Sequence, residues 1–186
     1  MNLKKFDKLK EGEALSKHKS LLEIGAVDID GKQIKKLGDV LKGKKLILIV
    51  NVASKCGLTK TNYVFMKKMY DKYKTLGLEI LAFPCNQFAS QEPADRIKIK
   101  AFARVTQNGE YQLFDKVNVN GANAHEIFKF LRYNSELYNK EDNTVGHIHW
   151  NFGKFLVDGA TGTQVTYHPS RGDLEDLEAM IKARLK

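Results

Sequence analysis

The chain has 186 residues, 42% of them hydrophobic and three of them proline, values typical of one folded globular domain. Its longest apolar run, residues 46–53, is far shorter than the roughly 20 residues that a membrane-spanning helix needs. The formal net charge of +9 comes from lysines spread along the chain, without an arginine-rich or aromatic-interleaved patch, so we expect no nucleic acid partner.

The N-terminal residues and the two cysteines indicate the compartment. Residues 1–7 carry positive charge with no apolar core behind them, unlike a secretory signal. Asp7, Glu11 and Glu13 break the acid-poor pattern of a mitochondrial presequence. Two cysteines are too few for a disulfide-stapled secreted scaffold. We therefore predict a cytoplasmic protein.

The N-terminal 20 residues form a charged extension to a single predicted domain over residues 21–186. Leu3, Phe6 and Leu9 recur at helical spacing in the extension. We interpret it as a frayed helix or a disordered segment.

Regular signals begin after residue 20. In chain order they predict a hairpin over 22–28 and 32–34, a buried strand over 45–53, a helix over 63–76, a buried strand over 78–83, helices over 93–103 and 123–133, a hairpin over 154–157 and 164–167, and a closing helix over 173–185. This order indicates an α/β domain with a central mixed β-sheet flanked by helices and an N-terminal β-hairpin.

Cys56 lies where the first buried strand ends and the next helix approaches. A helix N-terminus presents unpaired N–H groups and partial positive charge, and both favour a thiolate over a thiol. Lys55 adds a cationic neighbour. From this position alone, a buried and inert cysteine is an equal alternative.

Two further segments carry polar groups suited to a thiolate. The strand over 78–83 is expected to run parallel to the first, so the loop after it, which contains Gln91, leaves at the same sheet edge as Cys56. Trp150, the only tryptophan, is followed by Asn151. Amide and indole N–H groups can donate hydrogen bonds to a thiolate and stabilise its charge.

Residues 51–59, 81–93 and 150–156 together resemble the three signature motifs of the glutathione peroxidases in order, spacing and flanking residues. The resemblance extends over residues 20–186. It implies a thioredoxin-like fold and a thiol-dependent peroxidase that reduces hydrogen peroxide and organic or lipid hydroperoxides.

The resemblance also implies roles for four residues. Cys56 would be the peroxidatic residue, and Gln91, Trp150 and Asn151 would be its hydrogen-bonding partners. The cycle would pass through a Cys56 sulfenic acid and would need no metal or bound organic cofactor.

The reductant is less directly indicated. Thioredoxin-using members of the family carry a resolving cysteine two residues beyond an Ile-Lys-x-Phe pattern, and this chain has Arg104 at that place, after residues 99–102. Glutathione, an anionic thiol that suits a basic surface, is therefore the favoured reductant.

The alternatives are a thioredoxin-dependent cycle with Cys85 as resolver, or a peroxide sensor that relays oxidation to a partner. The Cys-x-x-Cys pair of a thiol–disulfide oxidoreductase is absent around Cys56.

The short connection between Leu131 and Trp150 bears on assembly and substrate. Tetrameric members of the family have a longer insertion there, so this chain resembles the monomeric, phospholipid-hydroperoxide type with an open site. Its basic surface would favour peripheral contact with lipid. His147 and His149 form a His-x-His pair without a completing acidic or cysteine cluster, so we predict no metal site.

Overall fold

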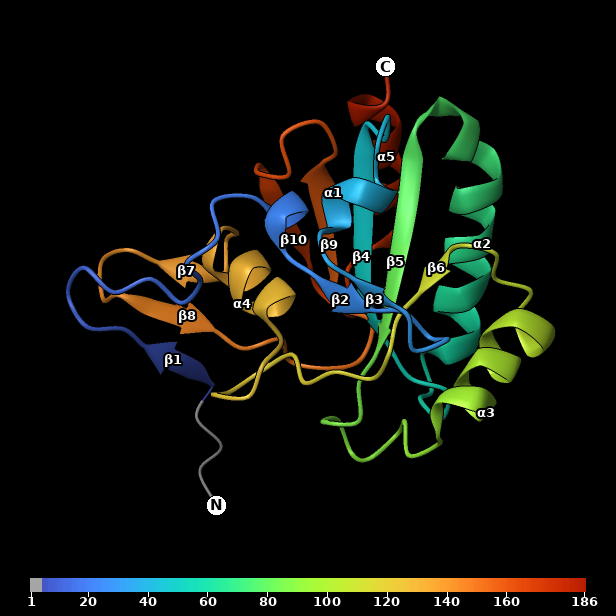
Figure 1. The fold of residues 1–186 in the computed structure, drawn as a ribbon, viewed down its shortest axis with the longest axis horizontal. Helices are drawn as coiled ribbons and strands as arrows, with labels where there is room; N and C mark the ends of the chain where they lie inside the picture. The colour runs from blue at the N-terminus through green and yellow to red at the C-terminus, as the bar shows by residue number, and fades with distance from the viewer. Residues whose placement is uncertain (1–4) are drawn as a thin grey trace.

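The computed structural model describes residues 5–186. Its centre is a mixed sheet in the order β10-β9-β4-β5-β6 (Figure 1). The strand bounds are β4 Leu46–Val52, β5 Leu78–Pro84, β6 Gln112–Leu113, β9 Lys154–Asp158 and β10 Val165–His168. β5 runs parallel to both β4 and β6, whereas β9 is antiparallel to β4 and to β10. The predicted central mixed sheet is confirmed.

The pairing of β4 with β5 is the longest in the molecule. It extends from Leu46 opposite Leu78 to Val52 opposite Pro84, and all residues of both strands are buried. Strands that are apolar on both faces can be stable only between two covering layers. Because the two strands are parallel, the loops that follow them leave from the same edge of the sheet (lower part of Figure 1).

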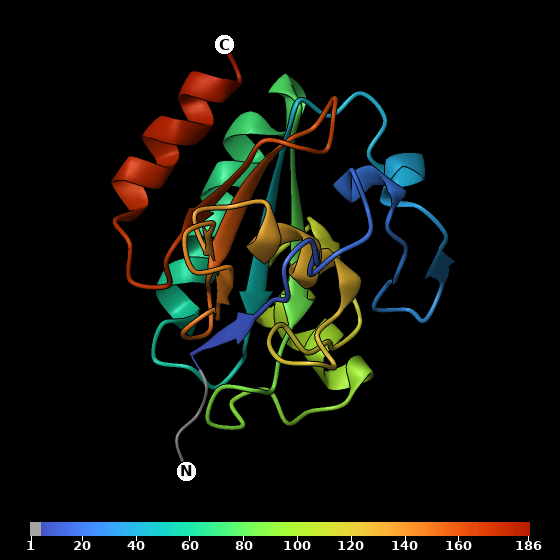
Figure 2. The same cartoon turned by 90° about the vertical axis from the view of Figure 1, so that its left-hand side faces the viewer.

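Helices cover both faces of this sheet. On one face, α2 and α5 pack against alternate residues of β4 such as Leu48 and Val50, whereas α1 and α4 pack on the other face against Ile47 and Ile49. Figure 2 shows α5 and α1 on opposite sides of the sheet. The helix bounds are α1 Leu37–Val40, α2 Thr59–Tyr73, α3 Arg96–Ala101, α4 Glu126–Tyr133 and α5 Leu174–Arg184. No helix within residues 5–186 is long and apolar enough to cross a membrane.

Three shorter segments complete the helical part. They are 3₁₀ turns over Leu21–Glu23 and Lys74–Leu76 and a π-helical segment over Phe102–Thr106. The predicted N-terminal hairpin is present as β2 (Ala26–Val27) and β3 (Gln33–Ile34), which pair antiparallel.

Two helices begin later than the sequence predicts. The helix expected from residue 93 begins at Arg96, because the Asp95 carboxylate accepts a hydrogen bond from the Lys98 amide and caps it. The helix expected from residue 123 begins at Glu126, where the His125 ring nitrogen accepts from the Ile127 amide. In both cases a capping side chain, rather than the first helix-compatible residue, determines the start.

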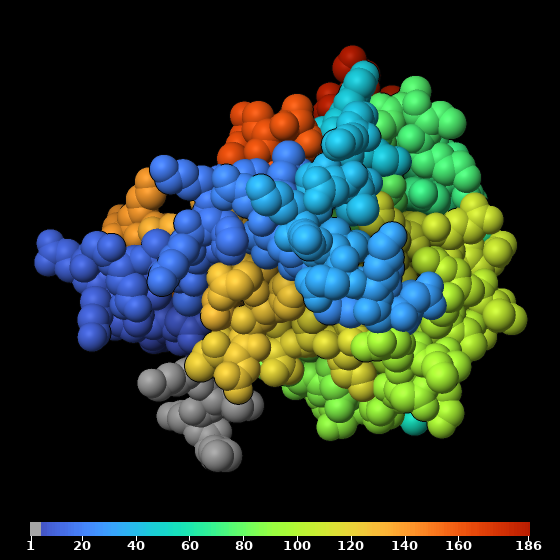
Figure 3. Space-filling view, viewed as in Figure 1, coloured from blue at the N-terminus to red at the C-terminus, as the bar shows by residue number. Residues whose placement is uncertain are grey.

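The N-terminal segment differs from the predicted helix. Residues Phe6–Lys8 form a strand, β1, that pairs antiparallel with β8 (Thr144–Gly146), and β8 in turn pairs with β7 (Tyr138–Asn139). Figure 3 shows these N-terminal residues, in dark blue, lying against the rest of the molecule. Leu9 is buried, whereas Leu3 lies outside the described residues. The extension is thus docked as a strand.

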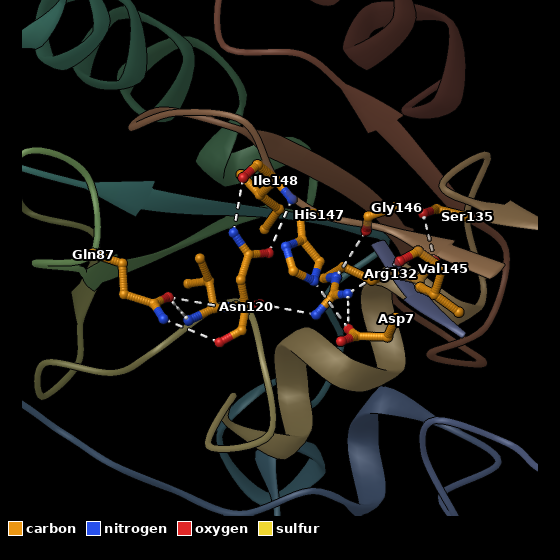
Figure 4. Close-up of polar contacts among 10 residues, drawn as sticks. Asp7, Gln87, Asn120, Arg132, Ser135, Val145, Gly146, His147 and Ile148 are labelled. Carbon is orange, nitrogen blue, oxygen red and sulfur yellow. Dashed lines mark hydrogen bonds and ion pairs between the residues drawn. The ribbon is translucent and has the colours of Figure 1, made fainter. Parts of the chain in front are cut away.

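A buried arginine holds this strand in place (Figure 4). The side chain of Arg132, in α4, is fully buried and forms an ion pair with Asp7 of β1. The same guanidinium donates to the carbonyl oxygens of Gly146 at 3.0 Å, Val145 at 3.3 Å and Val119 at 3.4 Å. Burial alone would raise the pKa of Asp7, but the hydrogen bonds and charges of Arg132 and His147 outweigh it and lower that pKa.

We predict that Asp7→Asn lowers the free energy of unfolding by roughly 1.5–3 kcal/mol at pH 7, because it leaves a buried guanidinium without its counter-charge. The pKa of Asp7 is lowered on folding, so its contribution is present above the ordinary value of 3.8 and is lost as the pH falls below it. Urea unfolding at pH 7 and pH 3 measures both effects, with Glu11→Gln on the same segment as the control. Equal stability of the two variants at pH 7 would contradict the assigned role.

Candidate active site

A short loop between β4 and α2 carries Cys56. Thr59, the first residue of α2, closes this loop, because its hydroxyl donates to the Ala53 carbonyl at 2.7 Å and accepts from the Cys56 amide at 3.2 Å. The amide of Leu58 points at the Cys56 sulfur, 3.5 Å away. The side chain is therefore held at the N-terminal end of α2, as predicted, with a backbone donor directed at Sγ.

The sulfur is buried but reachable. Cys56 is 8% exposed and lines an open pocket of about 530 Å³. The other residues that line this pocket include Ser54, Gly57, Lys60, Val64, Phe102 and Gln107. A thiol in this position is shielded from bulk solvent on most sides and open to a small molecule on one.

Gln91 and Asn151 meet beside the Cys56 loop. The Asn151 amide nitrogen donates to Oε1 of Gln91 at 2.8 Å, and the Gln91 carbonyl accepts from the amide of Lys55 at 3.0 Å. Asn151 is fully buried and Gln91 half-buried. Oε1 of Gln91 accepts this bond, and the side-chain nitrogen of Gln91 is the donor of the same amide group.

Trp150 is fixed through its backbone and its ring. Its carbonyl accepts from the Asn51 amide at 3.1 Å and from the Ser170 hydroxyl at 3.2 Å. Its ring lies 5.9 Å from that of Phe88, centroid to centroid, and packs against the core cluster that contains Cys56. The four predicted residues thus come from three loops at one edge of the sheet. Among residues 5–186, no hydrogen bond joins the sulfur to Gln91, Trp150 or Asn151.

Sequence reasoning missed a second link between these loops. The Ser54 hydroxyl donates to the buried Glu92 carboxylate at 2.6 Å, and the Glu92 amide donates to the Asn86 side chain at 2.8 Å. Burial raises the pKa of Glu92, although the hydrogen bond from Ser54 opposes this shift. The only signal in the sequence was the position of Glu92 next to Gln91, which does not reveal that the carboxylate points inward.

A buried lysine bonds the backbone of the loop that carries Trp150. Lys154, the first residue of β9, is fully buried, and its ammonium donates to the carbonyl of Phe152 at 2.7 Å. Phe152 has a φ of 67°, a left-handed backbone conformation that is uncommon for an aromatic residue. Desolvation lowers the pKa of Lys154 to about 8. We infer that Lys154 is a positioning residue for Trp150 and Asn151, two and one residues before the strained position.

Cys85 lies in a different environment from Cys56. It is fully buried in the core on the α1 and α4 face of the sheet, whereas Cys56 belongs to the core on the α2 and α5 face. Burial raises the pKa of the Cys85 thiol to about 11. Both cysteines are free. The sheet therefore separates the two thiols.

The two histidines before Trp150 lie in different surroundings. His147 faces Asp7, with Nε2 3.3 Å from Oδ2, while His149 is exposed. Across residues 5–186, no group of three or more histidine, cysteine, aspartate or glutamate side chains is arranged to hold a metal ion.

Solved structures identify the class of fold. A crystal structure of GPX1 from T. cruzi superposes with a TM-score of 0.65 and 32% identity, covering 90% of this chain and 97% of that one. A thioredoxin-family thiol:disulfide interchange protein from Chlorobium tepidum superposes with a TM-score of 0.60 at 17% identity, covering 90% of this chain and 96% of that one. The molecule therefore has a thioredoxin-like fold, with a cysteine at the edge where the parallel strands end.

Sequence comparison identifies the family. The glutathione peroxidase family model matches residues 21–132. A Citrus sinensis protein named as a probable phospholipid hydroperoxide glutathione peroxidase is 47% identical over 148 residues, which cover 79% of this chain and 84% of that protein. Similar plant proteins include some named as chloroplastic and mitochondrial. The chain belongs to the glutathione peroxidase family.

We predict that Lys154→Met lowers peroxidase kcat by roughly tenfold, because Trp150 and Asn151 lose the contact that positions their loop. The variant should still fold, because an apolar side chain can replace a buried charge without loss of stability. In the wild type, the folded state loses the Lys154 proton near pH 8 and the unfolded state near the ordinary value of 10.5. Stability from this group therefore increases between those values, and the variant should lack that increase. Unchanged kcat in a folded variant would refute the positioning role.

Differential alkylation tests the contrast between the two thiols. At pH 8 a thiol with a pKa of about 11 is only about one part in a thousand thiolate, so Cys85 should stay unmodified while Cys56 reacts with iodoacetamide. Mass spectrometry of the native protein should show a single label that Cys56→Ser removes. A second label taken up at a similar rate would mean that the core around Cys85 opens readily.

Proposed function

We propose that the protein reduces hydroperoxides with Cys56 as the peroxidatic thiol and glutathione as the electron donor. The observation that carries this proposal is the Cys56 sulfur at an open pocket, with the Leu58 amide directed at it and the linked pair Gln91 and Asn151 on two neighbouring loops. Family membership supplies the class of reaction, thiol-dependent reduction of a peroxide.

The proposed cycle has three steps. The Cys56 thiolate attacks the terminal peroxide oxygen; an S–O bond forms as the O–O bond breaks, and the departing oxygen takes a proton to leave as water or an alcohol. One glutathione thiol then displaces water from the sulfenic acid and forms a mixed disulfide. A second glutathione attacks that disulfide, releasing glutathione disulfide and the Cys56 thiol. The cycle uses no metal or bound organic cofactor.

Three residues are proposed to act on the reacting atoms. The amide nitrogen of Gln91, the indole N–H of Trp150 and the amide of Asn151 are donors around the Cys56 loop, suited to the thiolate and to the charge that develops on the departing oxygen. Asn151 contributes mainly through Gln91, because its nitrogen already donates to Oε1 of that residue at 2.8 Å.

The environments of Cys85 and Arg104 favour glutathione over a thioredoxin-type reductant. Cys85 is buried on the opposite face of the sheet, so it would need a large rearrangement to resolve Cys56. Arg104 occupies the place at which thioredoxin-using members of the family carry their resolving cysteine, and its guanidinium donates to the Gly109 carbonyl. A small thiol can reach the pocket without any such change.

Assembly, location and lipid contact belong to the same proposal. We expect a monomer in the cytoplasm that makes peripheral contact with lipid, supported by the short connection before Trp150 and the net charge of +9.

Peroxide consumption tests the proposal. Wild-type protein, Cys56→Ser and Cys85→Ser are each assayed with glutathione and, separately, with a thioredoxin system. We expect turnover with glutathione in the wild type and Cys85→Ser, and none in Cys56→Ser. Activity with thioredoxin alone that Cys85→Ser abolishes would overturn the proposed reductant. Oxidation of Cys56 without turnover with either thiol would instead indicate a peroxide sensor.

A further inference from the structure

The proposed reaction needs a group that stores one proton, because the departing oxygen of the peroxide takes one up. The side chains of Gln91, Trp150 and Asn151 donate hydrogen bonds but do not titrate. Within the described residues, the lining of the Cys56 pocket contains no histidine, aspartate or glutamate, and its one titratable group besides the thiol is Lys60, which is exposed to solvent. A proton store that is shielded from solvent must therefore lie behind the pocket wall.

Glu92 lies directly behind this wall. It follows Gln91 on the loop after β5 and is fully buried. Its Oε1 accepts a hydrogen bond from the Ser54 hydroxyl at 2.6 Å, and Ser54 itself lines the Cys56 pocket. One hydroxyl group therefore connects the pocket to the buried carboxyl group.

The surroundings hold Glu92 in place without neutralising its charge. Its backbone amide donates to Oδ1 of Asn86 at 2.8 Å. Oε1 has the Ser54 hydroxyl as its partner, whereas Oε2, within the described part of the chain, is buried without a hydrogen-bond partner. A buried carboxylate with so few neutral donors is costly in its charged form, so the protonated acid is favoured.

Four elements bring titratable groups toward Glu92. Lys55 of the Cys56 loop and Lys116 after β6 contribute positive charge, which opposes the rise in the pKa of Glu92 that burial causes. Tyr63 of α2 lies near enough to sense the carboxylate, and burial raises the pKa of this phenol well above its ordinary value. Cys85 follows β5, and burial raises the pKa of its thiol to about 11. Neither the phenol nor this thiol therefore ionises near neutral pH.

We propose that Glu92 stores the proton of the peroxidase reaction and exchanges it with the Cys56 pocket through the Ser54 hydroxyl. The inference rests on the proposed function and deepens it, because it identifies the source of the proton that the departing oxygen takes up. Glu92 acts through Ser54 and does not itself contact the peroxide.

The proton is conserved over the cycle. In the reduced protein, Cys56 is a thiolate and Glu92 is a carboxylic acid. As the S–O bond forms and the O–O bond breaks, the departing oxygen takes the Ser54 hydroxyl proton, and the proton of Glu92 replaces it. Glu92 is then a carboxylate beside a Cys56 sulfenic acid. The first glutathione thiol leaves water and a mixed disulfide, and the second returns its proton through Ser54 to Glu92 as the Cys56 thiolate is released.

The rate at which hydrogen peroxide oxidises Cys56 without any reductant tests the proton store. Mass spectrometry measures it as the loss of iodoacetamide-reactive Cys56. Glu92→Gln keeps an acceptor for Ser54 but has no titratable proton, and we expect oxidation to slow about 100-fold. In the wild type the rate should fall at alkaline pH as Glu92 loses its proton, and this fall should be absent from the variant.

Variants of Ser54 separate a proton path from a structural role. Ser54→Ala should slow oxidation as much as Glu92→Gln does, whereas Ser54→Thr keeps a hydroxyl and should retain most of the wild-type rate. The double variant Ser54→Ala/Glu92→Gln should be no slower than either single variant, because both changes remove one path. Glu79→Gln is the matched control, since Glu79 is also buried but lies at the start of β5, 2.8 Å from the Lys44 ammonium. It should keep the alkaline fall.

The outcomes distinguish this inference from the proposed function. Unchanged oxidation rates in Glu92→Gln and Ser54→Ala, or additive losses in the double variant, would overturn the inference alone. An alkaline fall that Lys60→Met abolishes and Glu92→Gln retains would assign the proton to the exposed lysine instead. If Cys56 of the wild type does not react with hydrogen peroxide, the proposed function fails together with the inference.

Discussion

The parallel pairing of β4 with β5 is the constraint on which the rest of the molecule depends. Seven residues of each strand pair in register, and all of them are buried between two layers of helices. Because the strands run in the same direction, their following loops leave from one edge, and these loops carry Cys56 and Gln91. The Lys55–Gln91 backbone bond and the Ser54–Glu92 side-chain bond then join the two loops.

Strand β9 contributes the third part of the site from the other side of β4. It pairs antiparallel with β4, so its start, rather than its end, lies at the same edge, and Trp150 and Asn151 precede it. Asn51 near the end of β4 and Lys154 at the start of β9 both bond the backbone around these two residues. Desolvation of the buried Lys154 ammonium lowers the stability of the fold near neutral pH. We attribute the presence of a charge at this position to its role in holding the loop that carries Trp150 and Asn151.

A separate small sheet of β1, β8 and β7 extends the domain beyond this frame. Its stability depends on Arg132, whose guanidinium is fully buried and needs Asp7 as counter-charge. Next to this strand, the Lys5 carbonyl accepts a hydrogen bond from the His147 amide at 2.8 Å.

The sequence alone was sufficient for the central strands and for the edge at which they end, because these follow from local hydrophobic patterning. Three long motifs placed Cys56, Gln91, Trp150 and Asn151 on loops at that edge, and the catalytic roles of these four residues stay a prediction. It did not reveal that residues 6–8 pair as a strand. Their partner strand is distant in the sequence, with Asp7 opposite Val145, and neither this pairing nor the burial of Arg132 produces a local sequence pattern. The inward direction of Glu92 and Lys154, and the separation of Cys85 from Cys56 by the sheet, were likewise decided by tertiary packing. Which face a side chain occupies, and what it meets there, depends on residues distant in sequence.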